Sequence, residues 1–394
     1  MGAACKDCLI ARGTRRKLGQ DRPVAGSPRD LRAGLALRWR PHSAPATPPA
    51  YTAATPVASI LPARCFTARA GMARRLFRST EVAMRACIDI GGTKVAVALA
   101  PAGTDRAALV ARRSEPTVKE GPPDALARQC LRMVDEACAE AGISRAQLQS
   151  TGVASCGPFI LQDGMVEVST PNICGGLPGA DRSLLPNDWT SIPLQAPLAE
   201  ALGRVNVQND AVAALVAERR WGALQGQDHC AYVTWSTGVG VGLCVDGSVL
   251  RGKNGNAGHA GHSFSSDGPP EAACGCGNVG DVESLVAGNA IPRRWGRDAG
   301  GLIGAARQGD AAAAEAVAQM CRVLGRMLYN LVAILDLQRI SVGGSVFLHH
   351  QDFLLPRLQA EVSGRLPALT GGVLVVPAGL GHQIGDYAAL AMAG

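Results

Sequence analysis

Residues 84–100, MRACIDIGGTKVAVALA, determine the fold of this chain. Two apolar runs stand on either side of the polar turn GGTK at residues 91–94. Near-continuous apolar runs of this length are typical of strands buried in a sheet. The sequence therefore predicts a strand, a glycine turn and a second strand, with Asp89 near the end of the first strand.

A second stretch, CAYVTWSTGVGVGLCVDG at residues 230–247, has the same arrangement, with the glycine-rich turn STGVGVG expected between two strands. Two such units, each followed by helical patterns, predict an α/β protein with two similar lobes facing a central cleft. We expect a smaller lobe over residues 84–200 and a larger lobe over residues 201–394. The last helix, expected at residues 386–393, could return to the first lobe.

Residues 1–83 differ in composition from the rest of the chain. They hold 15 Lys+Arg and 4 Asp+Glu, a balance of +11, which leaves 24 basic and 28 acidic residues, or −4, for residues 84–394. Residues 41–62 are rich in Pro, Ala and Thr, which predicts disorder. Either residues 1–83 are an Arg-rich organellar leader, or Met84 is the true start and the upstream stretch is translated non-coding sequence.

Composition and pattern also limit the expected partners. The mildly acidic residues 84–394 give no indication of a nucleic-acid partner, and residues 1–83 lack the two periodic helices of a helix-turn-helix. No run of 18 uncharged apolar residues is present, so no membrane span is expected. Most of the 13 cysteines stand singly in apolar runs, which predicts a cytoplasmic protein, with organellar targeting as the alternative.

Both glycine turns are candidate phosphate-binding sites. Glycine lets backbone N–H groups approach phosphate oxygens, and a threonine hydroxyl adds a donor. Asp89 could hold Mg²⁺ through water, because Mg²⁺ keeps much of its hydration shell. An ordinary β-hairpin turn would explain either turn taken by itself. The candidate nucleotide-contacting residues here are Asp89, Gly91, Gly92, Thr93, Lys94, Thr237, Gly238 and Gly240.

Two further pairs follow predicted strands. Asn209 and Asp210 stand between a short strand and a helix, where both residues favour the N-cap position. Alternatively Asp210 is a general base that accepts a proton from a substrate hydroxyl, with Asn209 binding a neighbouring hydroxyl. Gly343 and Gly344 follow the strand RISV and either form a plain turn or allow close approach of an adenosine group.

A third stretch, GNAGHAGHSFSSDGPPEAACGCGNVGDVE at residues 255–283, carries His and Cys at a spacing that suits a metal. Zn²⁺ prefers imidazole and thiolate, and two cysteines one residue apart cannot bridge to each other without strain. The alternatives are a glycine-rich surface loop with unlinked thiols, or Asp281 acting as the N-cap of a helix that begins VESLVAG. The expected zinc ligands are His262, Cys274, Cys276 and Asp281.

Taken in order, the motifs DIGGTK, ND, STGVGVG, GNAGHAGH, CGCGNVGDVES and VGGS resemble those of the ROK family, which includes glucokinase-like sugar kinases and repressors. The resemblance covers residues 84–394. It implies an actin-like ATPase fold with two RNase H-like lobes, a homodimer, and phosphoryl transfer from Mg-ATP to a hexose hydroxyl, usually the 6-position. It also implies that Asp210 is the catalytic base and that Asn172, Asn209 and His262 border the sugar.

Two positions depart from the family pattern. His259 stands where the family has a Glu that accepts hydrogen bonds from sugar hydroxyls, and an imidazole offers one acceptor at most. Asp281 stands where the family has its third zinc-ligating Cys, which should weaken zinc binding or alter its geometry. We therefore expect either a hexose such as glucose or an N-acylhexosamine as the sugar, and either ATP or polyphosphate as the donor. A non-catalytic sugar sensor or regulator is the third alternative.

Overall fold

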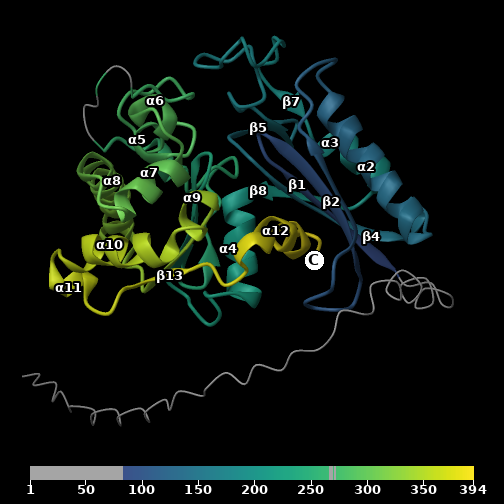
Figure 1. Cartoon of the computed structure of the whole chain (residues 1–394). Coiled ribbons are helices and arrows are strands. Elements are labelled where there is room, and N and C mark those ends of the chain that lie inside the picture. The colour runs from purple at the N-terminus through teal and green to yellow at the C-terminus, as the bar shows by residue number, and fades with distance from the viewer. Residues whose placement is uncertain (1–82, 266–268, 270–271) are drawn as a thin grey trace, which may run out of the picture. The chain divides into compact units, whose positions relative to one another are not determined.

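A computed structural model describes residues 83–265, 269 and 272–394, all within one compact unit that spans residues 67–394. The predictions made for residues 1–82 lie outside the described residues. Among the described residues, no helix has both the length and the apolar character needed to cross a membrane. The described residues form two large mixed sheets, one smaller sheet and the helices that cover them (Figure 1).

The first large sheet has the strand order β3-β2-β1-β4-β8. β1 (Met84–Ile90) and β2 (Lys94–Pro101) are antiparallel and are joined by the predicted glycine turn, so this prediction is confirmed. β3 (Val110–Pro116) pairs with β2, and β4 (Leu148–Ser155) and β8 (Val205–Asn209) run parallel to β1.

The side chains of β1 alternate between two apolar layers. Met84, Ala86, Ile88 and Ile90 pack against α2 (Ala125–Ala141) and α3 (Gln195–Leu202). Cys87 faces the opposite side, where it joins residues of α4 (Asp210–Trp221) and α12 (Ile384–Met392). Because strand side chains alternate, Asp89 faces this second side as well.

The second large sheet has the strand order β11-β10-β9-β12-β13. β9 (Cys230–Trp235) and β10 (Val239–Val245) are antiparallel, β11 (Ser248–Val249) pairs with β10, and β12 (Arg339–Gly343) and β13 (Leu374–Pro377) run parallel to β9. In both sheets the order is third, second, first, fourth and fifth strand. This repeated order confirms the prediction of two similar α/β units.

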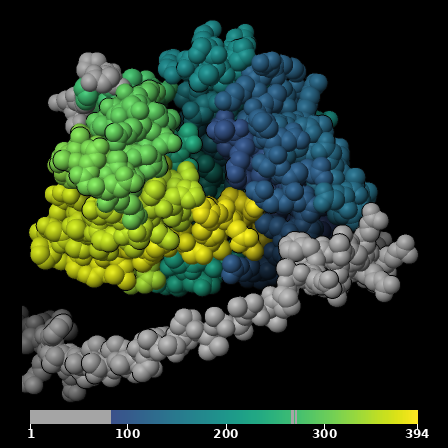
Figure 2. All heavy atoms as spheres, in the orientation of Figure 1, coloured from purple at the N-terminus to yellow at the C-terminus, as the bar shows by residue number. Residues whose placement is uncertain are grey.

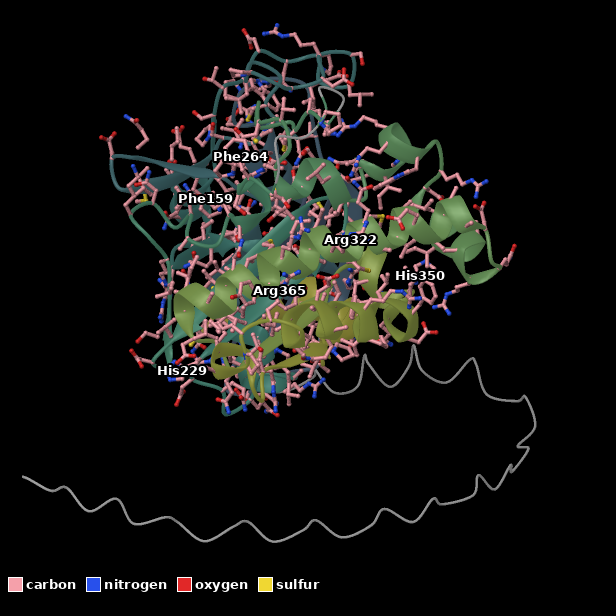
Figure 3. The ribbon with its side chains drawn as sticks, turned by 90° about the vertical axis from the view of Figure 1, so that its left-hand side faces the viewer. Phe159, His229, Phe264, Arg322, His350 and Arg365 are labelled. Atoms are coloured by element: carbon pink, nitrogen blue, oxygen red, sulfur yellow. The ribbon has the colours of Figure 1, made fainter. Side chains whose placement is uncertain are left out.

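Helices cover both faces of the second sheet. α7 (Ala299–Arg307), α8 (Ala311–Leu335) and α10 (Gln351–Ser363) share one large apolar cluster with it. In Figure 3, α8 crosses the front of the molecule and carries Arg322. α4 packs on the other face, against β9 and β10, and contacts α12, so these two helices lie between the two sheets (Figure 1).

The predicted turn at residues 236–242 is shorter than expected, because β10 begins at Val239. Gly240 and Gly242 lie within the strand, and α4 explains them. A Cβ on Gly242 would lie 2.4 Å from the Ala211 oxygen, and one on Gly240 would lie 3.2 Å from the Ala211 Cβ. These glycines let the first turn of α4 press against the strand, a requirement that a single-strand pattern does not reveal.

Several elements were not predicted, namely β3, α7, α10 and a third sheet of the order β5-β6-β7. They have short or amphipathic sequences without the continuous apolar runs on which the predictions relied. The remaining elements are β5 (Phe159–Gln162), β6 (Met165–Val168), β7 (Ile192–Pro193), α5 (Val282–Val286), α6 (Ile291–Trp295), α9 (Ser345–Leu348), α11 (Pro367–Thr370) and the 3-10 turns η1 (Arg145–Gln147), η2 (Ala260–His262) and η3 (Gly381–Gln383).

Candidate functional site

A cavity of about 620 Å³ is lined by residues of both large sheets and of the loops above them. Figure 2 shows a recess between the blue surface of the first sheet and the green surface of the second. The sequence-predicted residues that line this cavity are Gly91, Gly92, Thr93, Lys94, Asn172, Asn209, Asp210, Thr237, Gly238, Gly240, His259, His262 and Cys276.

The first glycine turn is held against the loop that carries Asn172. The Gly91 N–H donates to the Lys94 carbonyl at 2.9 Å and closes the turn. A Cβ on Gly92 would lie only 2.8 Å from the Cβ of Asn172, so a residue with a side chain would clash there. Thr93 and Lys94 are exposed at the tip of the turn. Backbone N–H groups and two polar side chains are therefore presented to the cavity.

Glu283 supports the second turn in a similar way. Its Oε2 atom accepts a hydrogen bond from the Val239 N–H at 2.9 Å. A Cβ on Gly238 would lie 2.6 Å from the same oxygen. The Gly288 N–H donates to the Ser236 carbonyl at 2.8 Å and ties the other end of the turn to the chain after α5. A side chain at residue 238 would therefore displace the Glu283 carboxylate that supports the turn.

Asn209 and Asp210 lie where β8 ends and α4 begins. The Oδ1 atom of Asn209 accepts from the N–H groups of Ala211 and Val212 at 3.1 and 3.4 Å, so Asn209 is the N-cap of α4. Because Oδ1 is used in this way, the Nδ2 amide of Asn209 is directed away from the helix. The Asn209 side chain therefore caps α4 with its oxygen and leaves its amide nitrogen available to the cavity.

Asp210 occupies the first position of α4 and lines the cavity. Burial raises the pKa of its carboxyl, the Ala211 N–H at 2.7 Å lowers it, and the charge of Glu283 raises it, with a result of about 6. A carboxyl with a pKa near 6 is ionised at neutral pH but binds a proton far more readily than an ordinary Asp. This is the property required of a general base.

Asp89 does not line the cavity and lies behind it, beneath α12. A Cβ on Gly385 would lie 2.3 Å from its Oδ2 atom, so α12 approaches this carboxylate closely at a glycine. Burial and the charges of Asp210 and Asp386 raise the pKa of Asp89 to about 7. When two carboxylates lie close together, their negative charges repel each other. A nearby cation therefore stabilises their ionised forms.

The segment that contains His259 and His262 lies flat against β10. A Cβ on Gly258 would lie 2.0 Å from the Val241 oxygen, and a Cβ on Gly261 would lie 2.1 Å from the Val239 oxygen. Glycine three residues apart therefore allows η2 to contact the strand backbone, and both imidazoles line the cavity. The two rings are stacked with centroids 6.0 Å apart.

The four predicted metal ligands come together. One ligand atom from each of His262, Cys274, Cys276 and Asp281 lies within 4.8 Å of every other. The Nδ1 atom of His262 is 3.3 Å from Asp281 Oδ2 and 3.6 Å from the Cys274 sulfur, and the Cys276 sulfur is 3.3 Å from Asp281 Oδ2. A sulfur and a nitrogen bound to one tetrahedral Zn²⁺ are about 3.5 Å apart, so the donors and their spacing fit this ion.

Asp281 caps α5 with one carboxylate oxygen, and the position of the other oxygen suits a metal ligand. Its Oδ1 atom accepts from the Ser284 N–H at 2.7 Å and caps α5, while Oδ2 faces the His and Cys ligands. Burial raises the pKa of this carboxyl, but hydrogen bonds from His262, the Ser284 N–H and the two thiols outweigh burial and bring it to about 2. The residue is fully buried. Its carboxyl group is ionised, as a carboxylate that binds a metal must be.

Gly343 and Gly344 do not line the cavity. They end β12, and a Cβ on Gly344, which has a φ of 89°, would lie 2.3 Å from the Trp235 oxygen. The next residue, Ser345, shares a hydrogen bond at 3.0 Å with the hydroxyl of Ser236, just before the second turn. The two glycines therefore lie beside the second turn rather than within the cavity.

Sequence reasoning missed several residues that line the cavity. Glu283 is the most informative, because it follows the ligand Asp281 by two residues and contacts both the second turn and, at 3.8 Å, the Cys274 sulfur. An acid so close to the Cys-Gly-Cys motif could have drawn attention to it. The other missed lining residues that carry polar groups include Lys119, Ser169, Thr170 and Asn289, and nothing in their local sequence distinguishes them.

The two large sheets have the same strand order, and each contains a hairpin with a glycine turn. These features define an α/β protein of the actin-like ATPase fold. The chain belongs to the ROK family, whose sequence model matches residues 85–394.

Three individual relatives illustrate the likeness. An N-acetylmannosamine kinase of Salmonella typhi is 36% identical over 268 residues, which cover 66% of this chain and 82% of that protein. A glucokinase of Aeropyrum pernix is 30% identical over 329 residues, which cover 78% of this chain and 95% of that protein. The solved structure of a ROK family glucokinase from Streptomyces griseus, in complex with glucose and AMPPNP, has a TM-score of 0.60 at 26% identity and covers 79% of this chain and 99% of that one.

Proposed function

We propose that this protein transfers a phosphoryl group from Mg-ATP to a sugar hydroxyl, at the 6-position of a hexose. The observation that carries the proposal is the cavity itself. It joins the glycine turns of two separate sheets to Asp210, a half-buried residue at the N-terminus of α4. Phosphoryl transfer needs electrostatic stabilisation of phosphate and a group that orients the acceptor hydroxyl, and this arrangement offers both.

The two turns would bind the phosphates from opposite sides. The donors would be the backbone N–H groups of Gly92, Thr93, Thr237 and Gly238 together with the Thr93 and Thr237 hydroxyls, and Lys94 would add a positive charge. Asp89, whose carboxyl lies behind the first turn, would hold Mg²⁺ through water; the ion, when bound, neutralises phosphate charge. Gly343 and Gly344, beside the second turn, would border the adenosine.

Asp210 would orient the acceptor hydroxyl and accept its proton. Its position at the first turn of α4 fixes the carboxylate through the Ala211 N–H. Asn209, held as the N-cap of the same helix, would bind a neighbouring hydroxyl with its free amide. The sugar would thereby be placed with one hydroxyl directed toward the phosphate between the turns.

The metal cluster would fix the sugar side of the cavity. Zn²⁺ held by His262, Cys274, Cys276 and Asp281 would join η2, the Cys-Gly-Cys turn and α5. His262 lines the cavity as well, so the same ion would position the imidazoles that border the sugar. Because one ligand is a carboxylate in place of a third thiolate, we propose weaker zinc binding than a site with three cysteines has.

An N-acylhexosamine is the second candidate acceptor. The specific observation in its favour is the 36% identity to an N-acetylmannosamine kinase, against 30% to a glucokinase. A purely regulatory role is less well supported, because Asp210 and both turns line the cavity together.

The test is a panel assay on the purified full-length protein, with glucose, mannose and their N-acetylated amines as acceptors and ATP or polyphosphate as donor. Asp210→Asn should lower kcat by at least about 100-fold, because the proton acceptor is lost while the size of the side chain is kept. Asp246→Asn, at a side chain that is 85% exposed, is the matched control and should leave kcat unchanged. Near-normal turnover by Asp210→Asn would refute the assignment. The molecular mass of the same sample in solution tests whether the protein forms the expected homodimer.

A further inference from the structure

Asn187 joins backbone segments that are far apart in the sequence. Its Oδ1 atom accepts from the N–H groups of Gly175 and Trp189 at 2.8 and 3.1 Å. Its Nδ2 amide donates to the carbonyl oxygens of Lys119 and Ile173, both at 2.9 Å. An amide side chain has two donor hydrogens and one oxygen with two lone pairs, so Asn187 forms every hydrogen bond that it can. One side chain therefore fixes the Lys119 loop to the loop that follows Asn172.

The Lys119 loop is also fixed to the first glycine turn. The Thr117 N–H donates to the Thr93 carbonyl at 3.0 Å, and the Thr117 hydroxyl donates to the Gly91 carbonyl at 2.7 Å. Lys119 follows Thr117 by two residues. Its backbone is thus held from one side by the turn that is proposed to bind phosphate, and from the other side by Asn187.

The loop that carries Asn172 adjoins the same turn. A Cβ on Gly92 would lie 2.8 Å from the Cβ of Asn172, and Asn172 directly precedes the Ile173 carbonyl that Asn187 holds. The first turn, the Lys119 loop and the Asn172 loop are therefore neighbours, and residues of all three line the cavity. In the proposed reaction, this is where the phosphate side of the cavity meets the acceptor side.

Lys119 brings to this place a positive charge that no acidic side chain balances. The residue is half-buried and lines the cavity. Within the described part of the chain, its ammonium group forms neither an ion pair nor a hydrogen bond. A partly desolvated ammonium group without an acidic partner favours a bound anion. The anion that the proposed reaction places between donor and acceptor is a phosphoryl group.

We propose that Lys119 binds the phosphoryl group of the phosphorylated sugar and that Asn187 is its positioning residue. The proposal deepens the proposed function and rests on a phosphorylated sugar occupying this cavity. Lys119 would add a charge-assisted contact on the acceptor side to the donors of the two glycine turns. Because glucose and N-acetylmannosamine are uncharged before transfer, Lys119 should distinguish the phosphorylated sugar from its parent.

The test measures dissociation constants by calorimetry on the full-length protein, for glucose, N-acetylmannosamine and the 6-phosphate of each. Lys119→Met removes the charge and keeps the length of the side chain. It should weaken binding of the 6-phosphate by at least about 10-fold and change binding of the parent sugar by less than about 2-fold. Lys119→Arg keeps the charge and should recover most of the affinity. Lys253→Met, at an exposed lysine outside the cavity, is the matched control and should behave as the wild type.

Equal weakening of the sugar and its 6-phosphate by Lys119→Met would overturn the proposal, because a loss of that kind reports a structural role. Unchanged binding of the 6-phosphate by this variant would overturn it as well, and so would a wild type that binds neither 6-phosphate.

Asn187→Asp tests the positioning role. The new carboxylate cannot donate, so it would face the carbonyl oxygens of Lys119 and Ile173 without a hydrogen bond to either. The change should reduce the preference for the 6-phosphate over the parent sugar, and should reduce it no further when Lys119→Met is already present. Asn206→Asp, which places a carboxylate against the Met392 carbonyl, is the matched control and should leave this preference unchanged. The same reduction in both backgrounds would contradict the assignment of Asn187.

Turnover on the same samples separates this inference from the proposed function. A wild type that phosphorylates a sugar, together with a Lys119→Met variant of unchanged 6-phosphate affinity, would overturn the inference and leave the kinase activity standing. A wild type that binds the 6-phosphate through Lys119 but phosphorylates no sugar would refute the kinase activity and leave the role of Lys119 standing.

Discussion

Two half-buried aspartates characterise the candidate site at the level of single residues. Burial is the largest cause of the raised pKa of both Asp89 and Asp210, and the charge of Asp210 adds to the effect on Asp89. In the protein without substrate, keeping both groups ionised costs free energy, and their environment favours the binding of a proton or a cation. Substrate binding with a divalent cation would remove that cost.

The raised pKa of Asp210 leads to a pH prediction. A general base must be ionised, and the carboxyl of Asp210 loses its proton as the pH rises through about 6. We therefore expect kcat/KM to fall below pH 6, by up to about 10-fold per pH unit, and to be level above pH 7 if no other group titrates. Initial rates across this range check the prediction, with metal content measured at each pH. Activity that rises as the pH falls through 6 would contradict it.

The residue scale also shows what the sequence can and cannot predict. Asp210 and the turn glycines Gly91, Gly92 and Gly238 line the cavity as expected, because they follow strands that could be recognised in the sequence, whereas Asn172 was expected only from the family resemblance. Glu283 and Lys119 were missed, because their place at the cavity depends on contacts between distant segments. The orientation of His259 was also out of reach, since it depends on the Asn256 carbonyl and on Phe159.

Short irregular elements carry much of the candidate site. η2, the turn at residues 274–278 and α5 are short, yet they position four potential metal ligands and Glu283. The Cys274 N–H donates to the Asn278 carbonyl at 2.8 Å, and the Val282 N–H donates to the Ser263 carbonyl at 3.1 Å. A bound ion would join these pieces more firmly than the hydrogen bonds alone.

Metal removal should therefore destabilise this part of the chain. A strong chelator should lower the Tm of the full-length protein by about 5–10 °C, and Zn²⁺ should restore it. Asp281→Cys supplies a third thiolate and should raise zinc affinity, whereas Cys138→Ser, in α2, should leave it unchanged. A Tm that does not respond to chelator, together with a protein that retains no zinc at equimolar concentration, would count against the site.

At the element scale, long helices and strands were predicted well and their connections were not. α8 (Ala311–Leu335) is a long run of good helix formers, and α2 is followed by Gly142, which has a φ of 71°. The second turn was predicted too long, because Gly240 and Gly242 serve the packing of α4 rather than a bend. A glycine in the sequence can thus indicate either a turn or close packing of a helix against a strand. Only the residue that it contacts in the structure distinguishes the two.

The whole molecule is organised around α4 and α12, which lie between the two large sheets. α12 comes from the end of the chain, yet it contacts β1 and β4 of the first sheet. A Cβ on Gly152 of β4 would lie 2.0 Å from the Ala389 oxygen, so helix and strand are in direct backbone contact. The side chain of Leu390 is fully buried in the shared apolar cluster.

This packing predicts that a change in α12 destabilises both halves of the molecule. Leu390→Ala should lower the free energy of unfolding by about 2–5 kcal/mol, because the cavity it leaves is enclosed. Ile334→Ala, at a residue that is 76% exposed, is the matched control and should change it by less than about 0.5 kcal/mol. Urea unfolding measures both, and hydrogen exchange in β1 and β4 should accelerate in the first variant only. Equal effects of the two substitutions would contradict this account.

The position of α12 has a consequence for biosynthesis. The first sheet is among the earliest of the described parts to leave the ribosome, but the helix that covers its Cys87 and Ala154 side is the last. Until α12 has been made, the part of that apolar surface that it covers is exposed to chaperones and to aggregation. A premature stop codon before α12 would therefore damage the first sheet, which is made long before this helix.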